Sequence, residues 1–68
     1  MSEPVYKVVE IVGTSEQSIS QAINNGIAKA SGTLRRLGWF EVAQIRGNIE
    51  SGKVHRYQVT LKVGFTIE

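Results

Sequence analysis

The segment from Tyr57 to Ile67 alternates without interruption between apolar residues and polar or small ones. Because successive side chains of a β-strand point to opposite faces of a sheet, this alternation predicts a strand with one apolar and one polar face. The apolar face has to be covered, and we expect a helix to cover it. The apolar set is Tyr57, Val59, Leu61, Val63, Phe65 and Ile67, and the opposite set is Gln58, Thr60, Lys62, Gly64 and Thr66.

The covering helix is predicted in residues 14–38, where the spacing of apolar residues changes from two to about 3.6. Its start is predicted by either of two capping patterns, Thr14 with Gln17 or Ser18 with Gln21, and Gly38 predicts its end. The apolar or small residues of the helical stripe are Ile19, Ala22, Ile23, Gly26, Ile27, Ala30, Thr33, Leu34 and Leu37.

Two further segments are rich in β-branched and aromatic residues, which are typical of strands. Residues 5–12 predict a first strand that ends at Gly13, and a strand that begins near Trp39 leads through a polar turn around residues 50–53 into the last strand. The order predicts an α+β fold, β-α-β-β, in which a three-stranded antiparallel sheet wraps around one amphipathic helix. Residues 1–68 are expected to form a single domain.

The length of the chain, 68 residues, leaves room for one hydrophobic core, and the chain has no cysteine that could form a disulfide or bind a metal as a thiolate. Oligomerisation is therefore the expected source of additional stability. No apolar run approaches the roughly 18 residues of a membrane span, and no signal-peptide pattern is present. We expect a soluble, cytoplasmic protein without a membrane partner.

Trp39 and Phe40 are adjacent, so they point to opposite faces if they lie in a strand. The charge on Glu41, which shares the face of Trp39, indicates that Phe40 belongs to the core. Trp39 then lies on the face that the helix leaves open, where it either packs in a subunit interface or stacks on a flat aromatic ligand, a contact worth roughly 1–3 kcal/mol for nucleobases. Gln58 shares the open face, and its planar amide is either a partner for the edge of a flavin or pyrimidine or an ordinary surface group.

Four segments read VYKVVEIVGTS, WFEV, IRG and YQVTLKVGF, and a helical segment separates the first two. Together they resemble the dodecins, small flavin-binding proteins with the same β-α-β-β order, over nearly the whole chain. The resemblance implies a hollow homododecamer that holds FMN or riboflavin in stacked pairs between tryptophans at subunit contacts. It implies that Trp39 stacks on the flavin, that Gln58 hydrogen-bonds the isoalloxazine ring and that Arg46 lies on the phosphate side. Thr66 stands where many bacterial members carry an arginine, which removes one expected cation.

The resemblance also implies that the protein stores or buffers flavin and quenches its photoreactivity, because a stacked tryptophan is a nearby electron donor. Coenzyme A or another phosphorylated small molecule is a further candidate ligand. We expect no enzymatic activity and no metal site, since the chain has one histidine, His55, and its single carboxylates on strands are typical solvated or paired groups. The alternatives are a single-stranded nucleic-acid-binding module that stacks bases on Trp39 and Tyr6, and a purely structural oligomer.

Overall fold

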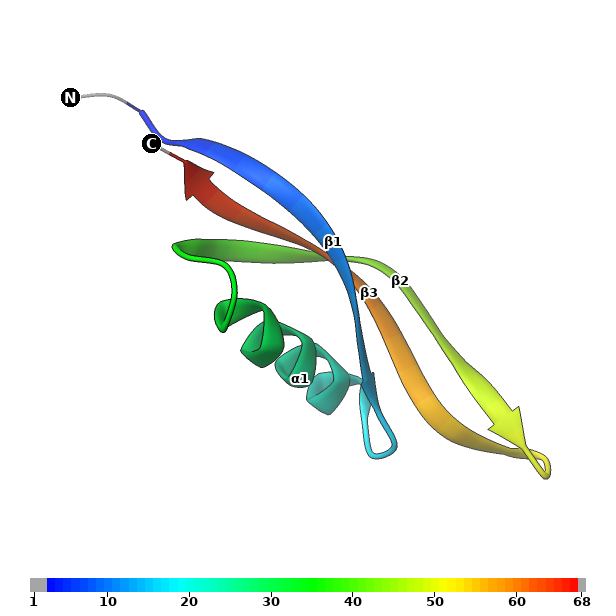
Figure 1. The fold of residues 1–68 in the computed structure, drawn as a ribbon. Coiled ribbons are helices and arrows are strands. Elements are labelled where there is room, and N and C mark those ends of the chain that lie inside the picture. The colour runs from blue at the N-terminus through cyan, green and yellow to red at the C-terminus, as the bar shows by residue number, and fades with distance from the viewer. Residues whose placement is uncertain (1–2, 68) are drawn as a thin grey trace.

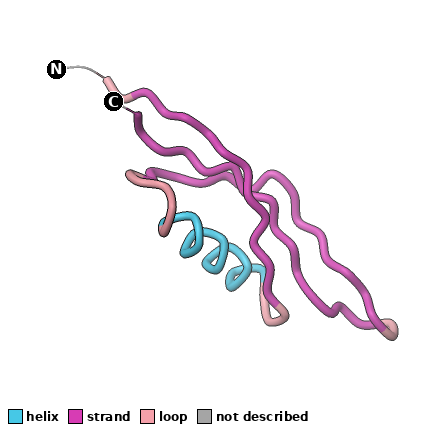
Figure 2. Tube along the Cα trace, viewed as in Figure 1, coloured by secondary structure: helices cyan, strands magenta, loops and turns pink. Residues whose placement is uncertain are grey.

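The computed structural model describes residues 3–67, in which one helix packs against one face of a three-stranded sheet (Figure 1). All strand pairs are antiparallel, and the order is β1-β3-β2, so the C-terminal strand lies in the middle. Figure 2 shows the helix on one side of the strands. The predicted β-α-β-β fold is confirmed. Its elements are β1 (Val5–Ser15), α1 (Ile19–Ser31), β2 (Leu37–Glu50) and β3 (Lys53–Ile67).

The start of α1 is fixed by one of the two predicted caps. The Ser18 side chain is the N-cap, and its Oγ accepts a hydrogen bond of 2.9 Å from the backbone N–H of Gln21. This bond satisfies one of the amides that every helix start leaves without an intrahelical partner. Thr14 belongs to β1 instead, and its carbonyl oxygen accepts a 3.0 Å hydrogen bond from Nδ2 of Asn25. Ser18 is therefore confirmed as the cap, and the Thr14 alternative is wrong. The return bond of a capping box is not made, because the Gln21 side chain donates to Asn25 and the Ser18 N–H donates to Oγ of Ser15.

The end of α1 lies at Ser31, well before the predicted end at Gly38. Gly32 closes the helix, and the next two backbone N–H groups both donate to the carbonyl oxygen of Ala30. Glycine is a weak helix former, so the helix gains little by continuing through this position. Gly38 lies in β2, and the residue with a left-handed φ in the connection is Arg36. No helix in residues 3–67 has the length and apolarity needed to cross a bilayer.

The hydrophobic core lies between α1 and the middle of β3. Val59, Leu61 and Val63 are at most 1% exposed and pack with Ala22 of the helix. These three residues belong to the predicted apolar face of the last strand, so that prediction is confirmed. Val9 and Ile11 of β1 pair with Val63 and Leu61, pack against the same core and complete the sheet face under the helix.

Gly13 marks the closest approach of the helix to the sheet. The sequence predicted that the first strand ends there, but β1 continues to Ser15. A Cβ atom on Gly13 would overlap the carbonyl oxygen of Ala22, and a Cβ atom on Gly26 would lie 3.3 Å from the Cα atom of Gly13. The position requires glycine because the helix backbone occupies the space of a side chain.

The β2–β3 hairpin closes through Ser51 and Gly52, which both have a left-handed φ, of 53° and 74°. This tight connection between Glu50 and Lys53 confirms the turn predicted from the sequence. Two consecutive left-handed residues match the right-handed twist of the flanking strands. Figure 1 shows that the tip of the hairpin extends far beyond the N-terminal end of the helix. We call this extension, residues 47–57, the hairpin arm.

We expect Gly13→Ala to lower the free energy of unfolding by about 1–3 kcal/mol, the usual effect of inserting a methyl group into a tightly packed contact. The measurement is the urea midpoint at a fixed protein concentration, because association also contributes to stability. Gly32→Ala is the matched control, since a methyl group there meets only the carbonyl oxygen of Lys29, at 3.4 Å. Equal midpoints for Gly13→Ala and the parent would show that the helix moves away from β1 without loss.

Candidate functional site

Trp39 lies at the start of β2 on the sheet face that the helix does not cover. Its cross-strand partner is Gly64, whereas the next residue, Phe40, pairs with Val63 in the core under the helix. The indole remains 41% exposed. The face predicted for Trp39 is therefore confirmed, and a large planar ring is available on the open face of the protomer.

Phe40 points to the helix face, as predicted, but the prediction that it is a core residue is wrong for a single protomer. Its side chain is 46% exposed. The reason is that α1 ends at Ser31 and packs mainly against β1 and β3, so no residue of β2 is buried. Phe40 instead lines an apolar hollow of about 170 Å³ with Ile27, Leu37, Gly38, Trp39 and Val63.

A second aromatic ring flanks the indole on the open face. Tyr6 of β1 lies with its ring centroid 5.7 Å from that of Trp39, at an interplanar angle of 57°. Tilted aromatic pairs at this separation attract each other because the edge of one ring meets the electron-rich face of the other. Tyr6 is therefore a neighbour of Trp39, and it is also 42% exposed.

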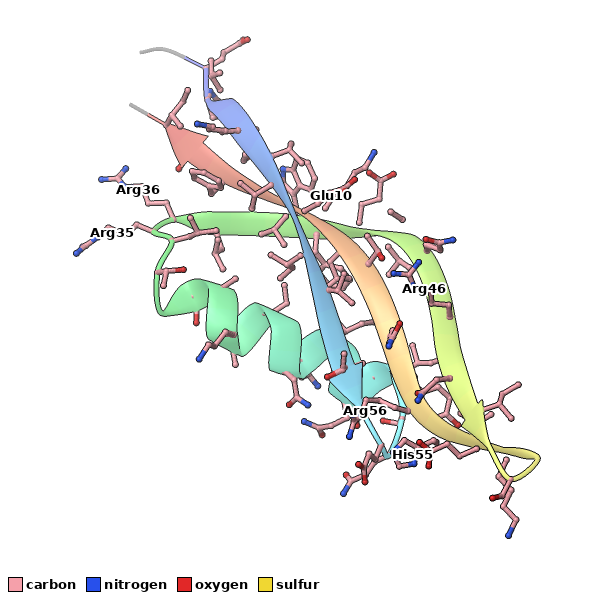
Figure 3. The ribbon with its side chains drawn as sticks, turned by 45° about the vertical axis from the view of Figure 1, so that its right-hand side comes forward. Glu10, Arg35, Arg36, Arg46, His55 and Arg56 are labelled. Atoms are coloured by element: carbon pink, nitrogen blue, oxygen red, sulfur yellow. The ribbon has the colours of Figure 1, made fainter. Side chains whose placement is uncertain are left out.

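Arg46 and Gln58 come together on the open face because of a β-bulge in β2. The register shifts between Val42 and Gln44, so Ala43 has no partner on β3. Strict alternation would place Arg46 on the face of Phe40, but the extra residue moves it to the face of Trp39, where it pairs with Gln58. Its Nε donates to Oε1 of Gln58 at 3.3 Å, and Figure 3 shows Arg46 extending from β2.

Trp39 does not meet this pair within one protomer. Its partner Gly64 and the partner of Arg46, Gln58, lie at opposite ends of a stretch of β3 that spans about 20 Å at roughly 3.3 Å per residue. Between them, Lys62 pairs with Glu10 on one side and with Glu41 on the other. The predicted site residues therefore share one face of the sheet but form two separate groups on it.

The remaining charged cluster lies at the base of the hairpin arm. Nη2 of Arg56 donates to Oε2 of Glu16 at 2.7 Å, and this contact lowers the pKa of the Glu16 carboxyl group, as do the charge of Arg56 and the nearby His55. His55 lies 3.9 Å from Glu16 and 3.6 Å from Glu50. Figure 3 shows His55 and Arg56 side by side at this end of the sheet. The cluster links the β1–α1 connection to the arm, and residues 3–67 contain no group of three or more acidic, His or Cys residues that could hold a metal ion.

Comparison with known proteins connects this geometry to one family. The family model described as Dodecin matches residues 5–68. A dodecin from Thermus thermophilus is 55% identical over 64 residues, which cover 94% of this chain and 93% of that protein. The solved structure of dodecin from Streptomyces coelicolor has a TM-score of 0.94 and 53% identity, and covers 100% of this chain and 97% of that chain. For dodecin from Streptomyces davaonensis the TM-score is 0.93 and the identity 49%, with 98% of each chain covered.

Proposed function

The chain belongs to the dodecin family, and from this membership we propose that it binds FMN or riboflavin, stores or buffers it, and quenches its photoreactivity within a homododecamer. The observation that carries the proposal is the indole of Trp39, 41% exposed on the open sheet face. Glu10, Lys62 and Glu41 cross that face as a row of mixed charge. A nucleic-acid surface would instead present a basic stripe, so the charge pattern favours a small flat ligand.

The residues on the open face fit the chemistry of a flavin. The indole provides a stacking surface, the Gln58 amide provides a donor and an acceptor in one plane, and the Arg46 guanidinium provides a cation for a phosphate group. A flavin held there would supply a light-absorbing ring, and the indole of Trp39 stacked against it would be a nearby electron donor. The role of Trp39 is then to hold the ring and supply that electron, and the role of Gln58 is to fix the orientation of the ring edge.

The apolar surface of the protomer supports assembly into a larger oligomer. A second hollow, of about 300 Å³, lies at the base of the hairpin arm, where Ile19 is the residue of α1 that borders it. Burial of such surface stabilises association by roughly 25 cal/mol for each Å² removed from water. The hollow is lined by Ile19, Ile45, Arg46, Gly47, Ile49, Val54 and Tyr57, and the exposed large apolar residues outside it are Val5, Tyr6, Val8, Val12, Trp39, Phe40, Val42 and Ile67.

The distance between Trp39 and the Arg46–Gln58 pair makes assembly necessary for a complete binding site. Because Trp39 lies about 20 Å along β3 from the Arg46–Gln58 pair, a ligand stacked on one indole meets such a pair only from another copy of the chain. Under the proposed function, binding sites therefore exist at subunit contacts, and the protomer alone holds only their parts.

For assembly, we expect the purified protein to sediment as a dodecamer at micromolar concentration, with no folded monomer. Phe40→Ala should weaken the oligomer by about 3–5 kcal/mol per protomer if the side chain becomes fully buried between subunits. Sedimentation velocity measures the oligomer, and far-UV circular dichroism controls for the fold of the variant. A stable folded monomer of the parent protein would contradict both the assembly and a site built between subunits.

For the ligand, we expect Trp39→Ala to weaken riboflavin binding by about 1–3 kcal/mol, the range measured for stacking on aromatic side chains, and to restore emission from the flavin that still binds. Gln58→Ala should weaken binding by about 1–3 kcal/mol, since a buried ring edge loses its hydrogen bonds, but should preserve quenching. Fluorescence titration reads affinity and emission separately, and Asn24→Ala, an exposed amide on the helix, is the control. The proposed site fails if Trp39→Ala binds riboflavin as tightly and with as little emission as the parent.

For ligand preference, we expect the affinities for FMN and riboflavin to agree within about tenfold, or 1.4 kcal/mol. The exposed Arg46 guanidinium already shares Nε with Gln58, and a solvent-exposed charge pair contributes only about 0–1 kcal/mol. Calorimetric titration at one salt concentration gives both constants, and Arg46→Ala should reduce binding of FMN more than binding of riboflavin. A hundredfold preference for FMN in the parent would mean that other cations build the phosphate site.

A further inference from the structure

Gly64 is buried although it lies on the face that the helix leaves open. The group that covers it is the indole of its cross-strand partner Trp39. A Cβ atom on Gly64 would overlap Cε2 and Cζ2 of that indole and would lie 2.8 Å from Cδ2. The six-membered part of the indole therefore occupies the space that a side chain at position 64 would fill.

The backbone at Gly64 does not itself require glycine. In the part of the chain that the structure describes, the glycine with a positive φ is Gly52 in the hairpin turn. Gly64 has a conformation open to other residues, so the reason for glycine here is space for the neighbouring ring.

The same space allows two outer strands to make contact across the middle one. Neighbouring strands lie about 4.8 Å apart, so β1 and β2 are separated by roughly 10 Å with β3 between them. The ring centroids of Tyr6 on β1 and Trp39 on β2 are nevertheless only 5.7 Å apart. The two rings approach each other across β3 next to Gly64, the residue of the open face of β3 that has no side chain. Gly38 adds to the fit, because a Cβ atom there would lie 3.1 Å from Cε1 of Tyr6.

We propose that Gly64 is a positioning residue for ligand stacking: it seats the indole of Trp39 against the middle strand, and Tyr6 limits the movement of the indole toward β1. One side of the indole is occupied by β3, and the opposite side remains open to a planar aromatic ligand. A methyl group at position 64 displaces the indole and changes the angle of this open side. This inference rests on the proposed flavin function, and it adds the element that orients the stacking surface.

The test is Gly64→Ala, read first without any ligand. Trp39 is the single tryptophan of the chain, so its emission and near-UV circular dichroism report directly on how the indole is held against Gly64. We expect both spectra to change, riboflavin affinity to fall at least tenfold and quenching to weaken, while sedimentation and far-UV circular dichroism stay as in the parent. Gly32→Ala, where a methyl group meets only the Lys29 carbonyl oxygen, should change none of these.

A smaller ring at position 39 distinguishes a specific effect on the position of the indole from a general loss of structure. In a Trp39→Phe background the smaller ring leaves room for the methyl group, so adding Gly64→Ala should reduce riboflavin affinity much less than it does beside Trp39. Tyr6→Leu provides the measurement if Gly64→Ala does not assemble: it removes the ring that limits the indole, and the emission anisotropy of Trp39 should fall in an intact oligomer.

The outcomes distinguish the inference from the function on which it rests. If the parent protein binds no flavin, the proposed function fails, while the ligand-free spectra still test whether Gly64 positions the indole of Trp39. If the parent binds riboflavin and Gly64→Ala gives the same Trp39 spectra, affinity and quenching, the positioning role is overturned. Equal losses from Gly64→Ala in the Trp39 and Phe backgrounds would also overturn it, because a seat specific to the indole predicts unequal losses. If Gly64→Ala does not assemble, the test is Tyr6→Leu, and an unchanged Trp39 anisotropy in that variant overturns the positioning role.

Discussion

The single helix is much shorter than the sheet it packs against, although α1 has 13 residues and the middle strand has 15, and most of the structure follows from this difference in length. The helix is about 20 Å long at 1.5 Å per residue, whereas β3 extends for about 50 Å. The core is therefore short and lies where Ala22 meets Leu61. The rest of the sheet is covered only in part by its own chain, and Phe40 and Ile45 on the helix-side face of β2 remain 46% and 52% exposed. Folding of one protomer leaves an incomplete core, and association of copies supplies the missing layer.

The two faces of the sheet divide the work of assembly and binding. Apolar side chains of β2 on the helix side are available to neighbouring subunits, whereas the opposite face carries Trp39 at one end and the Arg46–Gln58 pair near the other. The row of Glu10, Lys62 and Glu41 separates these two groups. Under the proposed function, the same contacts that complete the core also bring an indole of one chain to the polar pair of another. Binding of flavin and stability of the shell are then linked, since a ligand that binds only the assembled state stabilises it.

The predictions from the sequence are correct where they depend only on residues close together in the chain. The alternation of β3, the Ser18 cap and the turn at Gly52 each depend on residues close in sequence, and the structure has all three as predicted. The wrong predictions depend on contacts between distant segments. A glycine at position 13 predicts a strand end, because the local pattern contains no sign of the helix that lies over it. The burial of Phe40 depends on how far a helix reaches across a sheet, which no alternation encodes.

The face on which Arg46 lies could not be predicted from alternation either, because the bulge at Ala43 moves every later residue of β2 to the opposite face. Its side chain shares a face with Gln58 only through that reversal, and the motif resemblance indicated the role of Arg46 without the geometry.

Two glycines of the chain serve the fold and the site by the same physical means on opposite faces of the sheet. Gly13 leaves out a side chain so that the helix backbone can approach β1, and Gly64 leaves one out so that an indole can lie over β3. Neither has the left-handed φ that distinguishes Gly52, so at both positions the missing atoms matter more than conformational freedom. A methyl group has a different consequence at each: it separates packed backbones at Gly13, but it moves only one exposed ring at Gly64. The stability of the protomer and the orientation of its stacking surface are therefore controlled by separate positions.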